Sequence, residues 1–252
     1  MTDSAAHAAK TVRIVATADL HFGRHPAEVY ADFLSRAARG AAVMVVCGDL
    51  TDHGRVEEAE GLARIFTQSV HIPVAAVLGN HDYESGQQDQ VRDVLQHAGI
   101  HVLDGDAVEI EGIGFAGIKG FCGGFGARAL GPWGERIIKD FVQETIGEAL
   151  KLETALARLR SSTRIALLHY APIADTVAGE PAEIFPFLGS TRLEEPLTRY
   201  EVAAVFHGHA HHGQPEGHTS KGAPVYNVSW PLLQRVSPDA PFRQFDATPF
   251  HN

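Results

Sequence analysis

Short apolar runs alternate with segments of helical spacing along the first hundred residues. The run at residues 41–47 (AAVMVVC) has no charged position, as expected for a strand buried on both faces of a parallel sheet. Between such runs, apolar residues recur every three to four positions, the period of an amphipathic helix. We predict strands over 11–17, 41–47 and 73–78, and helices over 26–38, 55–69 and 87–98. Strands alternating with helices in this way indicate βαβ units and a parallel sheet.

The pattern changes after residue 100. Closely spaced short runs suggest hairpins, and residues 119–135 hold six glycines, which predicts a long loop. We predict strands over 102–103, 107–110, 113–118, 164–168, 202–206 and 225–228, and helices over 137–159 (with Gly147 a candidate interruption) and 191–200. Residues 237–252 have no clear period. The sequence therefore predicts one domain over 11–236 with two sheet-forming halves, a disordered tail at 1–10 and a C-terminal extension at 237–252.

Composition narrows the class of protein. Of 252 residues, 21 are basic and 31 acidic, so the net charge is −10 and a nucleic-acid polymer is not an expected partner. No stretch approaches the roughly 20 apolar residues that span a bilayer, and residues 1–10 do not resemble a signal peptide. Two cysteines make a disulfide framework improbable and fit a reducing compartment. We therefore expect a cytoplasmic protein without a membrane partner.

Side chains that can bind a metal follow five of the predicted strands. They are Asp19 and His21, then Asp49 and Asp52, then Asn80, His81 and Asp82, then His169, and finally His209 and His211. In open α/β sheets, ligands bind outside the carboxyl ends of the strands, so these clusters can converge. Each cluster is weak evidence alone, but their joint placement predicts one site. Asp82 is left out of the ligand set because a capping or turn role explains it.

The residue types indicate which metals fit. Aspartate, asparagine and histidine without thiolate suit Mn²⁺, Fe, Zn²⁺ or Ni²⁺ better than Ca²⁺. Seven such side chains exceed what one ion needs, whereas two divalent ions about 3.5–4 Å apart, sharing a carboxylate, would use them all. The sequence therefore predicts a binuclear centre.

The ordered motifs resemble those of the calcineurin-like metallophosphoesterase superfamily over roughly residues 12–228. They are Asp19-x-His21, Gly48-Asp49-x-x-Asp52, Gly79-Asn80-His81-Asp82, His169 and Gly208-His209-x-His211. The resemblance implies an α/β (α+β) fold, a four-layer sandwich of two mixed sheets flanked by helices. It implies a first metal ion held by Asp19, His21, Asp49 and His211, and a second held by Asp49, Asn80, His169 and His209, with Asp49 bridging.

The same resemblance implies the catalytic roles. His81 would touch no metal and would lie with Asn80 by the scissile phosphate, and Asp52 would orient His81. A water shared by the two ions would be available as hydroxide near neutral pH, and His81 would protonate the leaving oxygen. A second interpretation makes Asp52 the N-cap of the helix that begins near Arg55.

Three functions compete. The GDLTDHG stretch at 48–54 resembles bacterial cyclic-nucleotide phosphodiesterases, and His53 stands where Ser/Thr protein phosphatases place arginine. We expect hydrolysis of a small phosphodiester, a cyclic nucleotide or similar; a phosphomonoesterase comes second, and a catalytically silent scaffold third.

The glycine-rich loop leaves two alternatives open. It is either a surface connection or a lid over the metals. As a lid, it would direct Lys119 and Arg128 toward phosphate and offer Phe121, Phe125 or Trp133 for stacking on a base.

Overall fold

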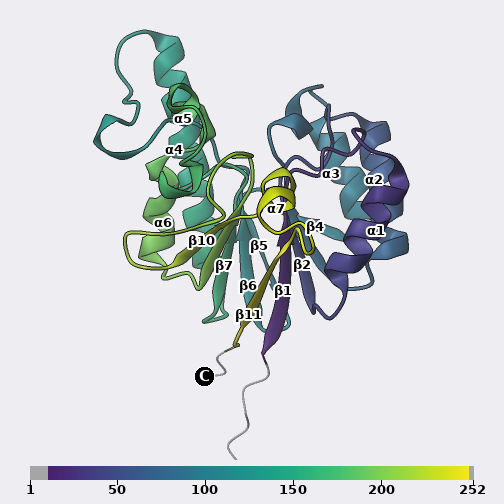
Figure 1. Ribbon diagram of the computed structural model, residues 1–252. Coiled ribbons are helices and arrows are strands. Elements are labelled where there is room, and N and C mark those ends of the chain that lie inside the picture. Colours follow the sequence, from purple (N-terminus) through teal and green to yellow (C-terminus); the bar gives the residue numbers. More distant parts are fainter. Residues whose placement is uncertain (1–10, 250–252) are drawn as a thin grey trace, which may run out of the picture.

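The computed structural model describes residues 11–249, and its strands form two sheets (Figure 1). The predicted disordered tail at 1–10 lies outside the described residues. The strands are β1 (Val12–Thr17), β2 (Val43–Cys47), β3 (Val74–Val77), β4 (Ile100–Val102), β5 (Asp106–Ile110), β6 (Ile113–Gly117), β7 (Arg164–Leu167), β8 (Ala204–His207), β9 (Glu216–His218), β10 (Pro224–Asn227) and β11 (Arg243–Ala247). The helices are α1 (Ala27–Ala38), α2 (Val56–Ser69), α3 (Gln88–His97), α4 (Arg136–Arg158), α5 (Phe185–Leu188), α6 (Glu194–Arg199) and α7 (Trp230–Val236).

Both sheets are mixed. The first has the order β11-β1-β2-β3-β4, in which β1 to β4 are parallel and β11 is antiparallel to β1. The second has the order β5-β6-β7-β8-β10-β9, with a parallel centre and antiparallel edges. Helices α1, α2 and α3 cover the first sheet, and α4 and α6 cover the second (Figure 1). The predicted four-layer sandwich is confirmed.

Strand β2 shows why the apolar runs have no polar position. Met44 and Val46 pack against the helices of the first layer, whereas Val43, Val45 and Cys47 pack against residues of the second sheet. All five residues are buried. Because successive side chains of a strand point to opposite faces, a strand between two apolar layers needs apolar residues throughout. The apolar layer between the two sheets therefore holds the ends of these strands in place.

Some predicted elements differ from the structure. Residues 237–252 were expected to lack regular structure, but β11 pairs with β1 along five residues. Only Phe245 and Ala247 of β11 are apolar, so the alternation is too short to detect. Strand β9 and helix α7 were not predicted either. Helix α4 runs through Gly147 without interruption, and a Cβ at that position would contact nothing within 4 Å. Within residues 11–249, no helix is both long and apolar enough to cross a membrane.

Candidate metal centre

The loops that follow the strands of both sheets are tied together by backbone hydrogen bonds. The Asp19 N–H donates to the Gly48 carbonyl and the His21 N–H to the Asp49 carbonyl, both at 2.9 Å. The His209 N–H donates to the two carboxylate oxygens of Asp19, at 3.1 and 3.0 Å. Since Asp19 follows β1 and His209 follows β8, this contact joins the two sheets at one edge.

Four of the predicted metal ligands have left-handed backbone conformations. The φ angles are 57° at Asp19, 44° at His21, 49° at Asp49 and 70° at His209. Among residues 11–249, the other non-glycine residues with positive φ are Glu111 and Glu201. This conformation is costly for residues with a Cβ, and such strain gathers at functional sites. The rest of the fold therefore offsets the strain that positions these side chains.

Two motif glycines allow the ligands to approach one another. A Cβ on Gly79 would lie 2.2 Å from Oδ1 of Asp49, and a Cβ on Gly48 would lie 2.3 Å from Nδ1 of His169. Gly48 also has a φ of 87°. Any other residue at either position would displace a ligand, so the glycines are required by the site and not by a turn alone.

Asp19, His21 and His211 form the first group of donor atoms that lie close enough to share an ion. His211 Nε2 lies 3.4 Å from Oδ1 of Asp19. His21 is 2% exposed, and neither of its ring nitrogens makes a hydrogen bond. Burial lowers the pKa of His21 to about 4, so its ring is neutral near pH 7 and carries a free lone pair. A buried unpaired nitrogen is unfavourable unless a cation or proton donor meets it.

Asp49, His169 and His209 form the second group, and Asn80 lies beside it. His169 Nδ1 donates to the Cys47 carbonyl at 3.0 Å, which leaves Nε2 without a proton because burial keeps the ring neutral by lowering its pKa. That Nε2 faces Oδ1 of Asn80 at 2.8 Å and Oδ1 of Asp49 at 3.4 Å. Three electron-pair donors thus converge on one point, as they would around a cation.

Asp49 lies between the two groups. Its Oδ2 is 3.7 Å from His21 Nε2, and its Oδ1 is the atom near His169. Burial and the charge of Asp19 raise the pKa of Asp49 well above its usual value. Burial alone would also raise the pKa of Asp19, but the hydrogen bond and charge of His211 outweigh it and hold that pKa low. The donor set therefore fits divalent cations, which would relieve the repulsion between two buried carboxylates.

His81 lies next to this centre and is partly exposed. Its ring contacts that of His21 edge to face, with centroids 4.5 Å apart. Its Nδ1 donates to the backbone carbonyl of Asp52 at 2.6 Å, whereas the Asp52 carboxylate lies 3.8 Å away and accepts from Arg24 Nε at 2.5 Å. The structure brings His81 and Asp52 together, but the close contact is made by the main chain.

The N-cap interpretation of Asp52 is wrong. Helix α2 has Arg55 at its N-cap position, and the carboxylate of Glu58 accepts from the backbone N–H groups of His53 (2.9 Å) and Arg55 (3.3 Å). Glu58 therefore accepts the hydrogen bonds of the backbone N–H groups at the start of the helix. The Asp52 side chain instead contacts Arg24 and His21.

Asp82, for which the sequence predicts a capping or turn role, supports two loops at once. It is fully buried and accepts from the N–H groups of Thr51 and Gly79, both at 2.8 Å, from Leu50 N–H at 3.2 Å and from the Thr51 hydroxyl at 2.6 Å. These contacts fasten the loop after β2 to the loop after β3. Its place in the Gly79–Asp82 motif was the available signal.

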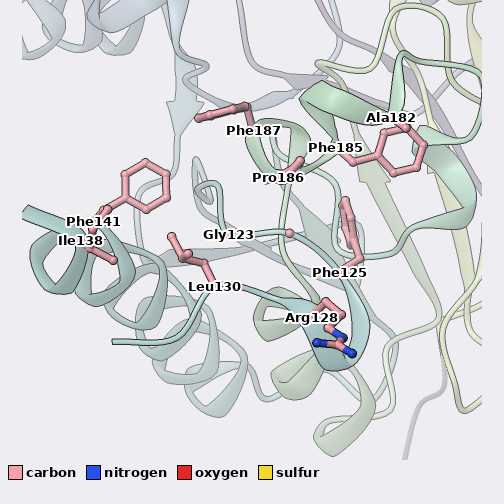
Figure 2. A pocket seen from close by; sticks show the side chains of 11 residues that line it. Gly123, Phe125, Arg128, Leu130, Ile138, Phe141, Ala182, Phe185, Pro186 and Phe187 are labelled. Atoms are coloured by element: carbon pink, nitrogen blue, oxygen red, sulfur yellow. The ribbon is translucent and has the colours of Figure 1, made fainter. Parts of the chain in front are cut away.

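Some residues of the glycine-rich loop are packing or surface residues, and others line a cavity. Lys119 is buried against the rings of Tyr83, Phe121 and Tyr170 and donates to the Gly120 carbonyl at 2.9 Å. Trp133 is 65% exposed and does not line the cavity beside the loop. Phe125 and Arg128 do line that cavity (Figure 2). Lys119 and Trp133 thus belong to the packing and surface of the loop.

Replacing Asp49 with Asn should abolish binding of both divalent ions, because one carboxylate serves both donor groups. Glu148→Gln is the matched control, since Glu148 is equally buried but lies on α4, where it accepts from the Gly120 N–H and from Lys151. Metal analysis after dialysis should show two ions per chain in Glu148→Gln and none in Asp49→Asn. Two tightly bound ions in Asp49→Asn would contradict the bridging position.

Comparison with solved structures agrees with this fold. One crystal structure superposes with a TM-score of 0.59 at 12% identity, covering 87% of this chain and 91% of the other. The crystal structure of TT1561 of Thermus thermophilus gives a TM-score of 0.55 at 16% identity, covering 95% of this chain and 99% of its own. At these identities the likeness shows the fold alone.

Sequence comparison supplies the family. An uncharacterized metallophosphoesterase of Aquifex aeolicus (strain VF5) is 33% identical over 103 residues, which are 39% of this chain and 38% of that protein. The model of the calcineurin-like phosphoesterase family matches residues 12–213, which contain every residue of both donor groups. The resemblance stated from the motifs is confirmed, and the chain belongs to the calcineurin-like phosphoesterase family.

Proposed function

We propose that this protein is a metal-dependent phosphoesterase that hydrolyses a small phosphodiester, a cyclic nucleotide or a similar compound. The observation that carries the proposal is that Asp49, a member of the second donor group, also lies beside the first, with His81 at the edge of the centre. Asp19, His21, Asp49 and His211 would hold one divalent ion, and Asp49, Asn80, His169 and His209 the other. When bound, such ions neutralise phosphate oxygens and make water a stronger nucleophile near neutral pH.

The contacts of His81 suit proton transfer to the leaving oxygen. Because the His81 Nδ1–H donates to the Asp52 carbonyl, the second ring nitrogen is the one that can give or accept a proton. The His81 backbone N–H also donates to Oδ1 of Asp49 at 2.9 Å. The same residue therefore holds the central carboxylate through its main chain and offers its ring to the substrate.

The charges around the site support a diester over a monoester. A monoester dianion gains from cationic contacts to its extra oxygen, whereas a diester carries one charge fewer. Arg24 is paired with Asp52, and Lys119 is enclosed by aromatic rings. His53 lies within 3.5 Å of Asp52 and 3.6 Å of Glu84, two carboxylates that oppose an anionic group. The cations of Arg24 and Lys119 are thus occupied by contacts within the protein.

Location and partners follow from the same features. Cys47 and Cys122 are unpaired and buried, which suits the cytoplasmic location that the sequence predicts. The net charge of −10 supports a small phosphoester as the ligand and not a nucleic-acid polymer.

The substrate class can be tested with one leaving group. Protein loaded separately with Mn²⁺, Zn²⁺, Ni²⁺ or Fe²⁺ is assayed on bis(4-nitrophenyl) phosphate and 4-nitrophenyl phosphate. Both substrates release 4-nitrophenolate, so the comparison isolates the effect of the second phosphate substituent. We expect kcat/KM for the diester to exceed that for the monoester by at least about tenfold. Asp49→Asn controls for contaminating phosphatases and should be inactive on both. A monoester preference would overturn the diesterase assignment, and no hydrolysis with any metal would favour a silent scaffold.

Replacing His81 with Ala should reduce kcat by roughly 10²–10⁴-fold on a diester with a poor alkoxide leaving group. The loss should be much smaller with 4-nitrophenolate, which leaves without a proton. Asp52→Asn should change kcat by less than about tenfold, because the close contact to His81 comes from the main chain. His53→Ala is the control for an exposed neighbouring histidine. An equal loss on both leaving groups would show that His81 acts by binding phosphate.

A further inference from the structure

An apolar cavity of about 490 Å³ opens between the glycine-rich loop, the start of α4 and helix α5. Its volume lies within the usual range of small-molecule sites. Figure 2 shows Phe141 and Phe125 on opposite sides of it, Phe187 at one end and Arg128 at the other. We call this cavity the Phe pocket; its other lining residues are Gly123, Gly124, Leu130, Ile138, Ala182, Phe185 and Pro186.

The Phe pocket adjoins the candidate metal centre. Phe187 lines the pocket, and its backbone carbonyl accepts from Nε2 of His209 at 3.2 Å. His209 belongs to the second donor group with Asp49 and His169. One residue therefore contacts both sites, and a substituent on a phosphoester held at the metal centre has an apolar surface within reach. The 57% exposure of Phe187 leaves that surface open.

The lining offers little to a polar ligand. The Gly123 N–H donates to the Pro186 carbonyl at 2.7 Å, the Gly123 carbonyl accepts from Leu130 at 2.7 Å, and the Gly124 N–H donates to Gly189 at 2.8 Å. These main-chain groups are used within the protein. Arg128 is exposed, at the end opposite Phe187. A nucleobase buried here would leave polar edge atoms unpaired, whereas an alkyl or aryl group would lose nothing.

We propose that the Phe pocket binds an apolar alkyl or aryl substituent of the phosphodiester substrate. This inference rests on the proposed function and narrows it: of the small diesters considered, those with a hydrophobic substituent fit this surface better than nucleotides. Aromatic and aliphatic side chains supply the binding energy through burial of apolar area, and the metal centre fixes the phosphate at the Phe187 end.

A homologous series tests the proposal. Metal-loaded protein is assayed on methyl, butyl, hexyl and octyl 4-nitrophenyl phosphate and on the 4-nitrophenyl ester of thymidine 5′-phosphate. KM should fall by up to about fourfold per added methylene until the pocket is filled, with kcat nearly constant. The thymidine ester should have a KM close to that of the methyl ester. Ile138→Asp should remove this dependence, whereas Ile137→Asp, one position away on α4, 73% exposed and outside the lining, should retain it.

Binding of non-hydrolysable alkylphosphonates, measured by calorimetry, distinguishes a failure of the Phe pocket from a failure of the diesterase assignment. If the diesterase assignment is wrong but the pocket is correct, phosphonate affinity still rises with chain length and Ile138→Asp still abolishes the rise. Chain-length independence of both KM and Kd, or equal effects of the two Asp variants, would overturn the pocket. Two further results would also overturn the pocket, provided that Ile138→Asp leaves phosphonate affinity unchanged. If the variant changes sedimentation, a second copy of the chain is the occupant. If it changes binding to phosphatidylcholine vesicles, a membrane is the occupant.

Discussion

The burial of two carboxylates side by side is the constraint that the rest of this structure must meet. Asp19 and Asp49 are both 1% exposed, and burial and the charge of Asp19 oppose ionisation of Asp49. Burial also lowers the pKa of His21 and of His169, so both rings are neutral and each has a free lone pair beside the carboxylates. Buried charges of one sign are tolerated only when opposite charge compensates them. Divalent cations bound by these side chains would supply that compensation.

The fold keeps this cluster in place from several directions. Left-handed residues turn the chain just after β1, β2 and β8, and Asp82 fastens the loops after β2 and β3. His207, fully buried in β8, contacts the Gly208 carbonyl through Nδ1 and the Thr176 hydroxyl through Nε2, both at 2.8 Å. It thereby supports the turn that carries His209. Phe187 then links the second donor group to the Phe pocket, because its carbonyl accepts from His209 and the residue lines the pocket.

Local patterns predicted the parallel strands and the convergence of the candidate ligands, whereas the four-layer sandwich was implied by the motif resemblance. Apolar runs predict buried strands, and parallel strands place their carboxyl ends at one edge. Features that depend on contacts distant in the sequence were missed. β11 pairs with β1 from the far end of the chain, and the Phe pocket joins residues 123–141 to residues 182–187. The N-cap interpretation of Asp52 went wrong because a residue type's preference for N-caps does not show which nearby carboxylate makes the contact, here that of Glu58.

The bridging position of Asp49 is most directly tested by anomalous diffraction from crystals of the metal-loaded protein, recorded at the absorption edge of the metal. We expect two peaks about 3.5–4 Å apart, with Asp49 oxygens within bonding distance of both. We also expect His21 and His211 at one peak and His169 and His209 at the other. A single peak, or two peaks of which only one contacts Asp49, would contradict the bridging position.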